Sequence, residues 1–180
     1  MITTFLILLN IFIYFNINLL IKKFNIFDIP NKNKVHKKKI SLVGGTILFV
    51  NIIIILIFEK INFINYFSSN KEFISFIIII SGFYLVGLYD DKYRLSPLSR
   101  IILMTIILYI SITLNNSLKI SKIEFSFIDK KFYLNDLSIF FSIISILIFT
   151  YSLNMFDGIN LQSITYCIFI FLIFYLLSKF

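Results

Sequence analysis

The residues most capable of chemistry are three aspartates that lie where long apolar stretches end. Asp90 and Asp91 are adjacent in GLYDDKYRLSPLSR, and Asp157 lies in NMFDGIN. A carboxylate at the centre of a bilayer costs on the order of 3 kcal/mol, so an acid beside an apolar segment calls for an explanation. Carboxylate oxygens suit Mg²⁺, and a carboxylate near a metal-bound phosphate can act as base or nucleophile. These positions are therefore candidate metal and catalytic residues.

The Asp90-Asp91 pair predicts two different roles rather than one shared role. Successive residues point about 100° apart on a helix, so both carboxylates cannot face one ligand in the same way. The alternative is an ordinary helix end at the membrane interface, with Lys92 and Arg94 as counter-ions.

A second cluster, DIPNKNKVHKKKISLVGG, brings a run of cations together with the only histidine. Lys34 and His36 offer cationic donors, and Gly44 and Gly45 allow the backbone to approach an anion. This pattern predicts a phosphate-binding loop. The alternative is a solvated loop that sets membrane topology and attracts anionic lipid.

The third cluster surrounds Asp157. If the helix continues through it, Asn154, Asp157 and Asn160 follow at i, i+3 and i+6 and form a polar stripe on one face. Gly158 would allow a ligand or another helix to approach closely. Asp157 has no nearby cation in the sequence, so its partner is expected to be a metal ion or the basic loop.

The elements that must position these clusters are membrane helices. The sequence is 59% apolar and 14% charged, with a mean hydropathy of +0.95. Its apolar runs are near-continuous instead of alternating, which favours helices over a β-barrel. The net charge of +8 lies mostly beside these runs, so it indicates topology and not nucleic-acid binding. The single cysteine, Cys167, excludes an internal disulfide.

The predicted fold class is an all-α polytopic membrane protein, with residues 1–180 forming one membrane domain. Segments long enough to cross a bilayer predict about six transmembrane helices. They cover residues 2–21, 41–58, 73–89, 97–115, 137–153 and 161–180. The segment near 118–134 alternates apolar and polar residues, which predicts a small external β-hairpin.

The positive-inside rule predicts the orientation of these helices. Seven lysines lie in the loop after the first span: Lys22, Lys23, Lys32, Lys34, Lys37, Lys38 and Lys39. Their number places that loop in the cytoplasm and the N-terminus outside. Alternation of the spans then puts all three clusters on the cytoplasmic side.

The three clusters together resemble motifs of the polyprenyl-phosphate N-acetylhexosamine-1-phosphate transferases, glycosyltransferase family 4. The first is similar to D-x-P-N-x-R-K-x-H-x-x-P-x-P-x-x-G-G, matched at Asp28, Pro30, Asn31, Lys34, His36, Gly44 and Gly45 but not at Asn33, Lys39 and Ser41. The second is similar to G-x-x-D-D-x-x-x-L-x-P-x-x-K, matched at Gly87, Asp90, Asp91, Leu95 and Pro97, with Arg100 for Lys. The third is similar to N-x-x-D-G-x-D-G-L, matched at Asn154, Asp157 and Gly158, with Asn160 and Leu161 replacing the second Asp-Gly.

The resemblance implies transfer of a sugar-1-phosphate from a UDP-amino-sugar to a polyprenyl (undecaprenyl) phosphate, with release of UMP, in cell-wall or surface polysaccharide synthesis. It implies Mg²⁺ as cofactor, with Mn²⁺ as the alternative. The implied roles are catalysis by Asp90 and Asp91, metal binding by Asp90, Asp91 and Asp157, and substrate binding by Asn154, Asp157, Asn160, Lys34 and His36. The implied location is the bacterial inner membrane, with a cytoplasmic active face.

Members of this family normally have ten or eleven spans, with a later G-D-x-G-S metal motif and a His- or Arg-rich loop. Neither feature occurs in these 180 residues, so the chain is expected to correspond to the N-terminal part of such a transferase. A second copy or a separate C-terminal half is the expected protein partner. The alternatives are a truncated inactive relative and a non-enzymatic membrane protein, such as a transporter piece or an assembly partner.

Overall fold

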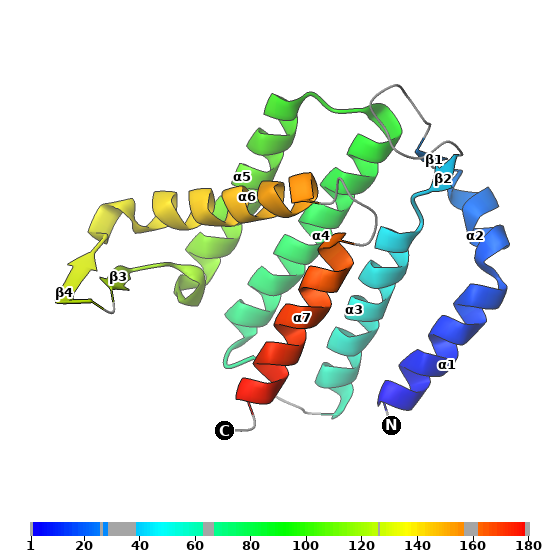
Figure 1. Cartoon of the computed structure of the whole chain (residues 1–180), viewed down its shortest axis with the longest axis horizontal. Helices are drawn as coiled ribbons and strands as arrows, with labels where there is room; N and C mark the ends of the chain where they lie inside the picture. The colour runs from blue at the N-terminus through cyan, green and yellow to red at the C-terminus, as the bar shows by residue number, and fades with distance from the viewer. Residues whose placement is uncertain are drawn as a thin grey trace. The chain divides into compact units, whose positions relative to one another are not determined.

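The described part of the chain is mostly helical, with two short strand pairs (Figure 1). This computed structural model describes residues 2–25, 27–28, 39–62, 67–125, 127–156 and 162–178. The helices are α1 (Ile2–Phe15), α2 (Ile17–Phe24), α3 (Gly44–Asn62), α4 (Asn70–Tyr93), α5 (Pro97–Leu114), α6 (Ser138–Phe156) and α7 (Gln162–Leu177). The strands are β1 (Phe27–Asp28), β2 (Ile40–Ser41), β3 (Lys122–Phe125) and β4 (Ile128–Tyr133), and short 3-10 turns cover Asn116–Leu118 and Asn135–Leu137. The chain divides into unit 1, Met1–Ser117, and unit 2, Leu118–Phe180.

Among the residues that the structure describes, three helices are long and apolar enough to cross a membrane: α4, α5 and the segment Asn135–Met155, which covers α6 except for its last residue. The bent pair formed by α1 and α2 brings the number to four if it counts as one span. Gly44–Phe58 in α3 and Ile164–Leu177 in α7 are shorter apolar helices. A helix therefore occupies each of the six predicted stretches. The helical membrane fold is confirmed, and the number of six spans stays a prediction.

The first apolar stretch differs from the continuous helix expected over 2–21. It bends by 69° between α1 and α2. At the break, the Asn16 side chain donates a hydrogen bond to the Phe12 carbonyl at 2.9 Å, and its own backbone N–H is shared between the Phe12 and Ile13 carbonyls. Asparagine competes in this way with regular helical bonding. The hydropathy of the stretch does not reveal this break, because one asparagine changes the average very little.

Capping residues define the α4–α5 helical hairpin. The Ser69 hydroxyl accepts a hydrogen bond from the Glu72 backbone N–H at 3.1 Å, which satisfies one of the N–H groups left open at the start of α4. Ser96 caps α5 in the same way, and Pro97 begins that helix. Only residues 94–96 connect the two helices, so the last turn of α4 must lie beside the first turn of α5.

Small residues allow α4 and α5 to pack closely. A Cβ atom placed on Gly82 would lie 2.8 Å from Cδ1 of Ile107. Ser75 on α4 and Ser111 on α5 are fully buried, as is Leu108. Close approach through small residues is typical of helix pairs in lipid, where van der Waals contact replaces the hydrophobic effect as the driving force.

The predicted β-hairpin is present in unit 2. Strands β3 and β4 pair antiparallel, with Lys122 opposite Tyr133 and Glu124 opposite Lys131. The shorter antiparallel pair of β1 with β2 was not expected from the sequence. Each of its strands is two residues long, too short to show an alternating pattern.

The contact at Gly82 makes a prediction about stability. Gly82→Leu should lower the free energy of unfolding by about 1–3 kcal/mol, because the larger side chain overpacks the α4–α5 interface. Gly87→Leu is the matched control, since the position of its Cβ has no neighbour within 4 Å. Thermal unfolding of the detergent-solubilised protein measures both variants. Ile107→Ala should partly restore the Gly82→Leu protein, and equal stability of the two leucine variants would contradict this packing.

Candidate active site

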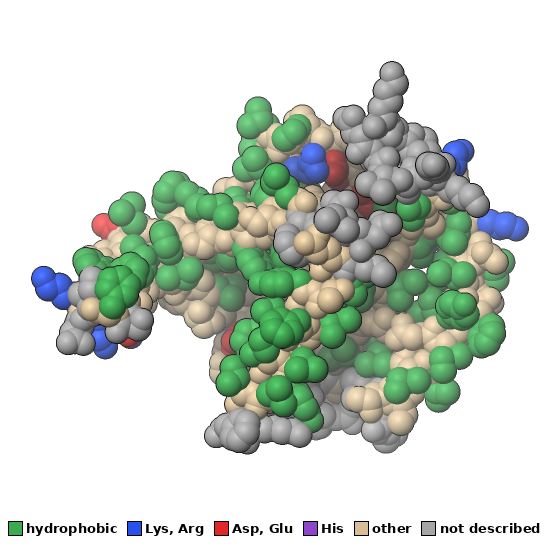
Figure 2. All heavy atoms as spheres, viewed as in Figure 1, with side chains coloured by type: hydrophobic (Ala, Val, Ile, Leu, Met, Phe, Trp, Pro, Cys, Tyr) green, Lys and Arg blue, Asp and Glu red, His purple; other side chains and the backbone are tan. Residues whose placement is uncertain are grey.

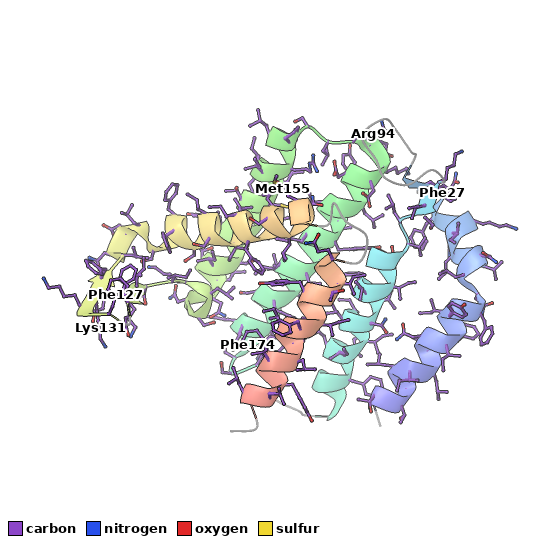
Figure 3. The ribbon with its side chains drawn as sticks, in the orientation of Figure 1. Phe27, Arg94, Phe127, Lys131, Met155 and Phe174 are labelled. Carbon is purple, nitrogen blue, oxygen red and sulfur yellow. The ribbon has the colours of Figure 1, made fainter. Side chains whose placement is uncertain are left out.

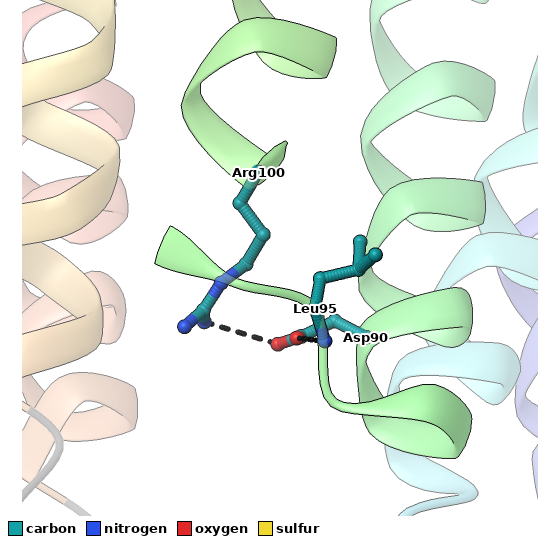
Figure 4. A network of polar contacts seen from close by, with 3 residues as sticks. All are labelled: Asp90, Leu95 and Arg100. Atoms are coloured by element: carbon teal, nitrogen blue, oxygen red, sulfur yellow. Dashed lines mark hydrogen bonds and ion pairs between the residues drawn. The ribbon is translucent and has the colours of Figure 1, made fainter. Parts of the chain in front are cut away.

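Asp90 links the last turn of α4 to the first turn of α5 through hydrogen bonds (Figure 4). Its Oδ1 accepts a hydrogen bond from the Leu95 backbone N–H at 2.9 Å, and its Oδ2 accepts one from Nη1 of Arg100 at 3.0 Å. The Asp90 and Arg100 side chains are only 21% and 28% exposed. Charge-assisted hydrogen bonds of this kind are stronger than neutral ones. Both Asp90 oxygens therefore have a part in shaping the turn.

The counter-ion of Asp90 is Arg100, not the neighbouring cations that the alternative interpretation named. Lys92 lies over the Tyr93 ring, with its Nζ 5.2 Å from the ring centroid. Arg94 ends α4 in the left-handed conformation, with φ of 52°, and its N–H donates to the Asp90 carbonyl at 2.7 Å. Lys92 thus contacts an aromatic ring, and Arg94 caps the end of α4.

Asp91 lies on a different side of α4, at a cavity of about 320 Å³ between α3 and α4. From α3 the cavity is lined by Gly45, Thr46 and Phe49, and from α4 by Tyr84, Gly87 and Asp91, among others. The Tyr84 hydroxyl donates a hydrogen bond to Oγ1 of Thr46 at 3.2 Å. The Phe49 and Tyr84 rings stack, with centroids 4.0 Å apart and an interplanar angle of 7°. These contacts hold the start of α3 beside the end of α4.

The structure therefore brings parts of two predicted clusters together. Gly45 belongs to the basic-loop cluster and Asp91 to the aspartate pair, and both line this cavity. Positions for a Cβ on Gly45 and on Gly87 have nothing within 4 Å, so both glycines border open space. Phe27 in β1 and Arg94 lie toward the same end of unit 1 (Figure 3). Lys34 and His36, the predicted phosphate-binding residues between β1 and β2, lie outside the described residues.

The third cluster belongs to unit 2. Asn154 lies near the end of α6, and its side chain is exposed. Asp157 and Asn160 lie outside the described residues. A separate cavity of about 280 Å³ is lined by Phe149, Ser152 and Leu153 of α6 and by Tyr166 of α7. The predicted convergence of Asp157 with the aspartate pair stays a prediction.

The fit of this site to a divalent metal differs between the two aspartates. Asp90 pairs with Arg100, and Asp91 lines a cavity that the hydroxyl-bearing residues Thr46 and Tyr84 also line. Within the described ranges, no group of three histidine, cysteine or acidic residues could hold a metal. The donors present fit one part of a Mg²⁺ site, for which oxygen ligands are required.

Sequence reasoning missed Arg100 and the Tyr84–Thr46 bond as organisers of the site. The first could have been inferred, because a short connection after α4 brings residue 100 back within reach of residue 90. The second depends on how α3 and α4 pack, and no local pattern indicates that contact.

The Asp90–Arg100 pair should show energetic coupling. A double-mutant cycle with Asp90→Ala and Arg100→Ala should give a coupling energy of about 1–2 kcal/mol. This is less than the energy of a fully buried charged hydrogen bond, because water partly screens the pair. The same cycle with Asp90→Ala and Lys92→Ala is the control, and its coupling energy should be close to zero. Unfolding in mixed micelles measures both cycles. Equal coupling in the two cycles would support Lys92 as the counter-ion.

Comparison with known protein families matches residues 73–180 to the model of Glycosyl transferase family 4. The matched region includes the aspartate pair, Asn154 and Asp157, and it covers more than half of the chain. Searches of curated proteins and of solved structures give no match. The family expected from the motifs is thus confirmed, and the chain is a membrane protein that belongs to Glycosyl transferase family 4.

Proposed function

We propose that the chain takes part in transfer of an N-acetylhexosamine-1-phosphate from a UDP-sugar to polyprenyl phosphate, in cell-wall or surface polysaccharide synthesis. The observation that carries this proposal is the position of Asp91. Its carboxylate lies at the end of a membrane helix, beside the glycine-bearing start of another helix that follows a basic loop. A lipid phosphate and a soluble nucleotide-sugar would meet at such a boundary.

In the proposed reaction, an oxygen of the lipid phosphate attacks the sugar-linked phosphorus of the UDP-sugar. A new phosphorus–oxygen bond forms, the bond to the bridging oxygen breaks, and UMP leaves with that oxygen. Asp91 orients the attacking phosphate and accepts its proton where that phosphate arrives protonated. When bound, Mg²⁺, or Mn²⁺ in its place, neutralises the charge of the pyrophosphate.

Asp90 and Asp91 take divided roles in this proposal. The contacts of Asp90 with Leu95 and Arg100 support a positioning role, in which it fixes the end of α4. Asp91 takes the catalytic role and binds the metal together with Asp157, which also contacts the substrate. Substrate contacts are assigned to Lys34 and His36 for the anionic groups, and to Asn154 and Asn160 for the nucleotide side.

We also propose the membrane arrangement predicted from charge. Six spans, an outer N-terminus and a bacterial inner membrane would place the three clusters on the cytoplasmic face. The lysines Lys22 and Lys23 in the last turn of α2 fit this arrangement, because they would lie at the cytoplasmic end of the first span. Later metal and substrate groups would come from a C-terminal half or a partner chain, as expected for a ten- or eleven-helix transferase.

The proposal predicts UMP release when native membranes, which contain the chain together with its C-terminal half or partner chain, are incubated with UDP-N-acetylglucosamine, polyprenyl phosphate and Mg²⁺. Asp91→Asn should lower the rate by about 10²-fold or more, the scale of losing a general base. Asp90→Asn should have a smaller effect and should also lower the thermal stability, since it weakens the bond to Arg100. Release of UMP and formation of lipid-linked sugar are measured together.

Two controls make this test decisive. Lys92→Ala alters a cation of the same helix end and should leave the rate unchanged. Omission of polyprenyl phosphate should abolish UMP release, which separates transfer from hydrolysis. Absence of product above membranes that lack the chain would contradict the proposal and favour an inactive or non-enzymatic relative.

A further inference from the structure

The β3–β4 hairpin has two chemically different faces. Directly paired residues of an antiparallel ladder point to the same side, and successive residues alternate. Lys122 and Tyr133 therefore share one side with Glu124 and Lys131. Ile123 and its partner Phe132 lie on the other side, which we call the apolar face and which also includes Phe125.

The opposite, charged face is held together by ion pairs. Nζ of Lys122 lies 2.6 Å from Oε1 of Glu124, and Nζ of Lys131 lies 3.4 Å from the same atom. The hydrogen bond and charge of Lys122, with a further hydrogen bond from Lys131, hold the pKa of Glu124 below its usual value. Glu124 therefore stays ionised at neutral pH, and this face favours water.

The apolar face has large aromatic side chains that unit 2 leaves uncovered. Phe125 is 44% exposed and Phe132 is 48% exposed, and Phe127 at the tip is 79% exposed. Phe125 contacts both other rings, at centroid distances of 5.5 and 6.0 Å. Figure 2 shows hydrophobic and charged side chains beside one another at the surface of the hairpin end, at the left of the view. An isolated two-stranded hairpin is marginally stable in water, so a cover for this face would add stability.

Hydrogen bonds fix the base of the hairpin to the start of a membrane helix. The Ile120 backbone N–H donates to the Ser142 hydroxyl at 2.8 Å, and that hydroxyl donates to the Ser138 carbonyl at 2.7 Å. Ser142 is fully buried. The Leu134 N–H donates to the Ser121 carbonyl at 2.9 Å and closes the base of the hairpin.

The apolar face is continuous with surface that lipid must cover. The first residues of the segment Asn135–Met155, which is long and apolar enough to cross the membrane, include Leu137 at 64% exposure and Phe140 at 63%. Since Ser138 and Ser142 belong to these same turns of α6, the hairpin is held at the level where this helix enters the bilayer. The labelled Phe127 and Lys131 mark its position in Figure 3.

We propose that the apolar face of the β3–β4 hairpin lies in the boundary between lipid headgroups and acyl chains, with its charged face toward water. The partner is the phospholipid bilayer that already surrounds α6. Aromatic rings are enriched at this depth. Lys130 alternates onto the apolar side, and its long stem can carry the ammonium group back to the headgroups. The proposal does not depend on the transfer reaction.

The sequence contains no tryptophan, so a single substitution creates a unique fluorescent reporter. Phe132→Trp and Phe125→Trp report on the apolar face, and Tyr133→Trp is the matched control on the charged face, one residue away. Each full-length variant is reconstituted in phosphatidylcholine nanodiscs, with and without dibrominated acyl chains. Iodide serves as the aqueous quencher.

We expect brominated lipid to quench both apolar-face reporters by roughly twofold more than the Tyr133→Trp control, because only that face reaches the acyl boundary. Iodide should show the reverse order. Equal exposure of all three reporters to iodide would overturn the proposal, as would apolar-face reporters shielded from both quenchers. The latter result would indicate that protein, such as a second copy of this chain, covers the face. Matching circular dichroism spectra and elution volumes confirm that each variant is folded.

Discussion

The bond between Asp90 and Arg100 is the constraint on which the arrangement of the candidate site depends. Successive residues on a helix point about 100° apart, so a residue that faces α5 turns its neighbour toward another element. Asp90 faces Arg100 of α5, and Asp91 faces the cavity beside α3. The ion pair thus fixes Asp90 toward α5, while Asp91 lines the cavity beside α3. Two adjacent acids of equal chemistry therefore have different surroundings, Arg100 for Asp90 and the cavity beside α3 for Asp91.

The same turn links the site to the packing of unit 1. Gly82 allows α5 to approach α4, and the Tyr84–Thr46 bond and the stacked Phe49 and Tyr84 rings hold α3 on the other side. A shift in either interface would move Asp91 relative to the glycines at the start of α3. Small residues and aromatic contacts in the helices thus determine where Asp91 lies.

Local patterns in the sequence were sufficient to predict the helices and the hairpin, but not the contacts between them. The apolar run over 97–115 predicted the bounds of α5 to within one residue, because the length of an apolar run is a local property. The alternation of apolar and polar residues predicted the β3–β4 pair, because alternation is also a local property. The break at Asn16 and the pairing of β1 with β2 depend on single side chains and very short strands, which no periodicity can indicate.

The candidate site, like the fold, could be predicted from the sequence only in part. The motifs identified Asp90, Asp91 and Gly45 as members of one functional set, and the structure places Asp91 and Gly45 at one cavity. The choice of Arg100 as the partner of Asp90 follows from the length of a turn, and the role of Tyr84 follows from helix packing. Residue types show which chemistry is present in the chain, but their division into catalytic and positioning groups requires the three-dimensional contacts.

The proposed transferase site requires that acids far apart in the sequence meet at one membrane face. Disulfide crosslinking of Asp91→Cys with Asp157→Cys, in a Cys167→Ser background and in native membranes, measures this distance directly. The account predicts rapid crosslinking within one chain, since a disulfide requires Cα atoms within about 7 Å and small motions bring nearby pairs together. Leu85→Cys paired with Asp157→Cys is the control and should not crosslink. Failure of the 91–157 pair, with the two cysteines labelled from opposite sides of the membrane, would contradict the account.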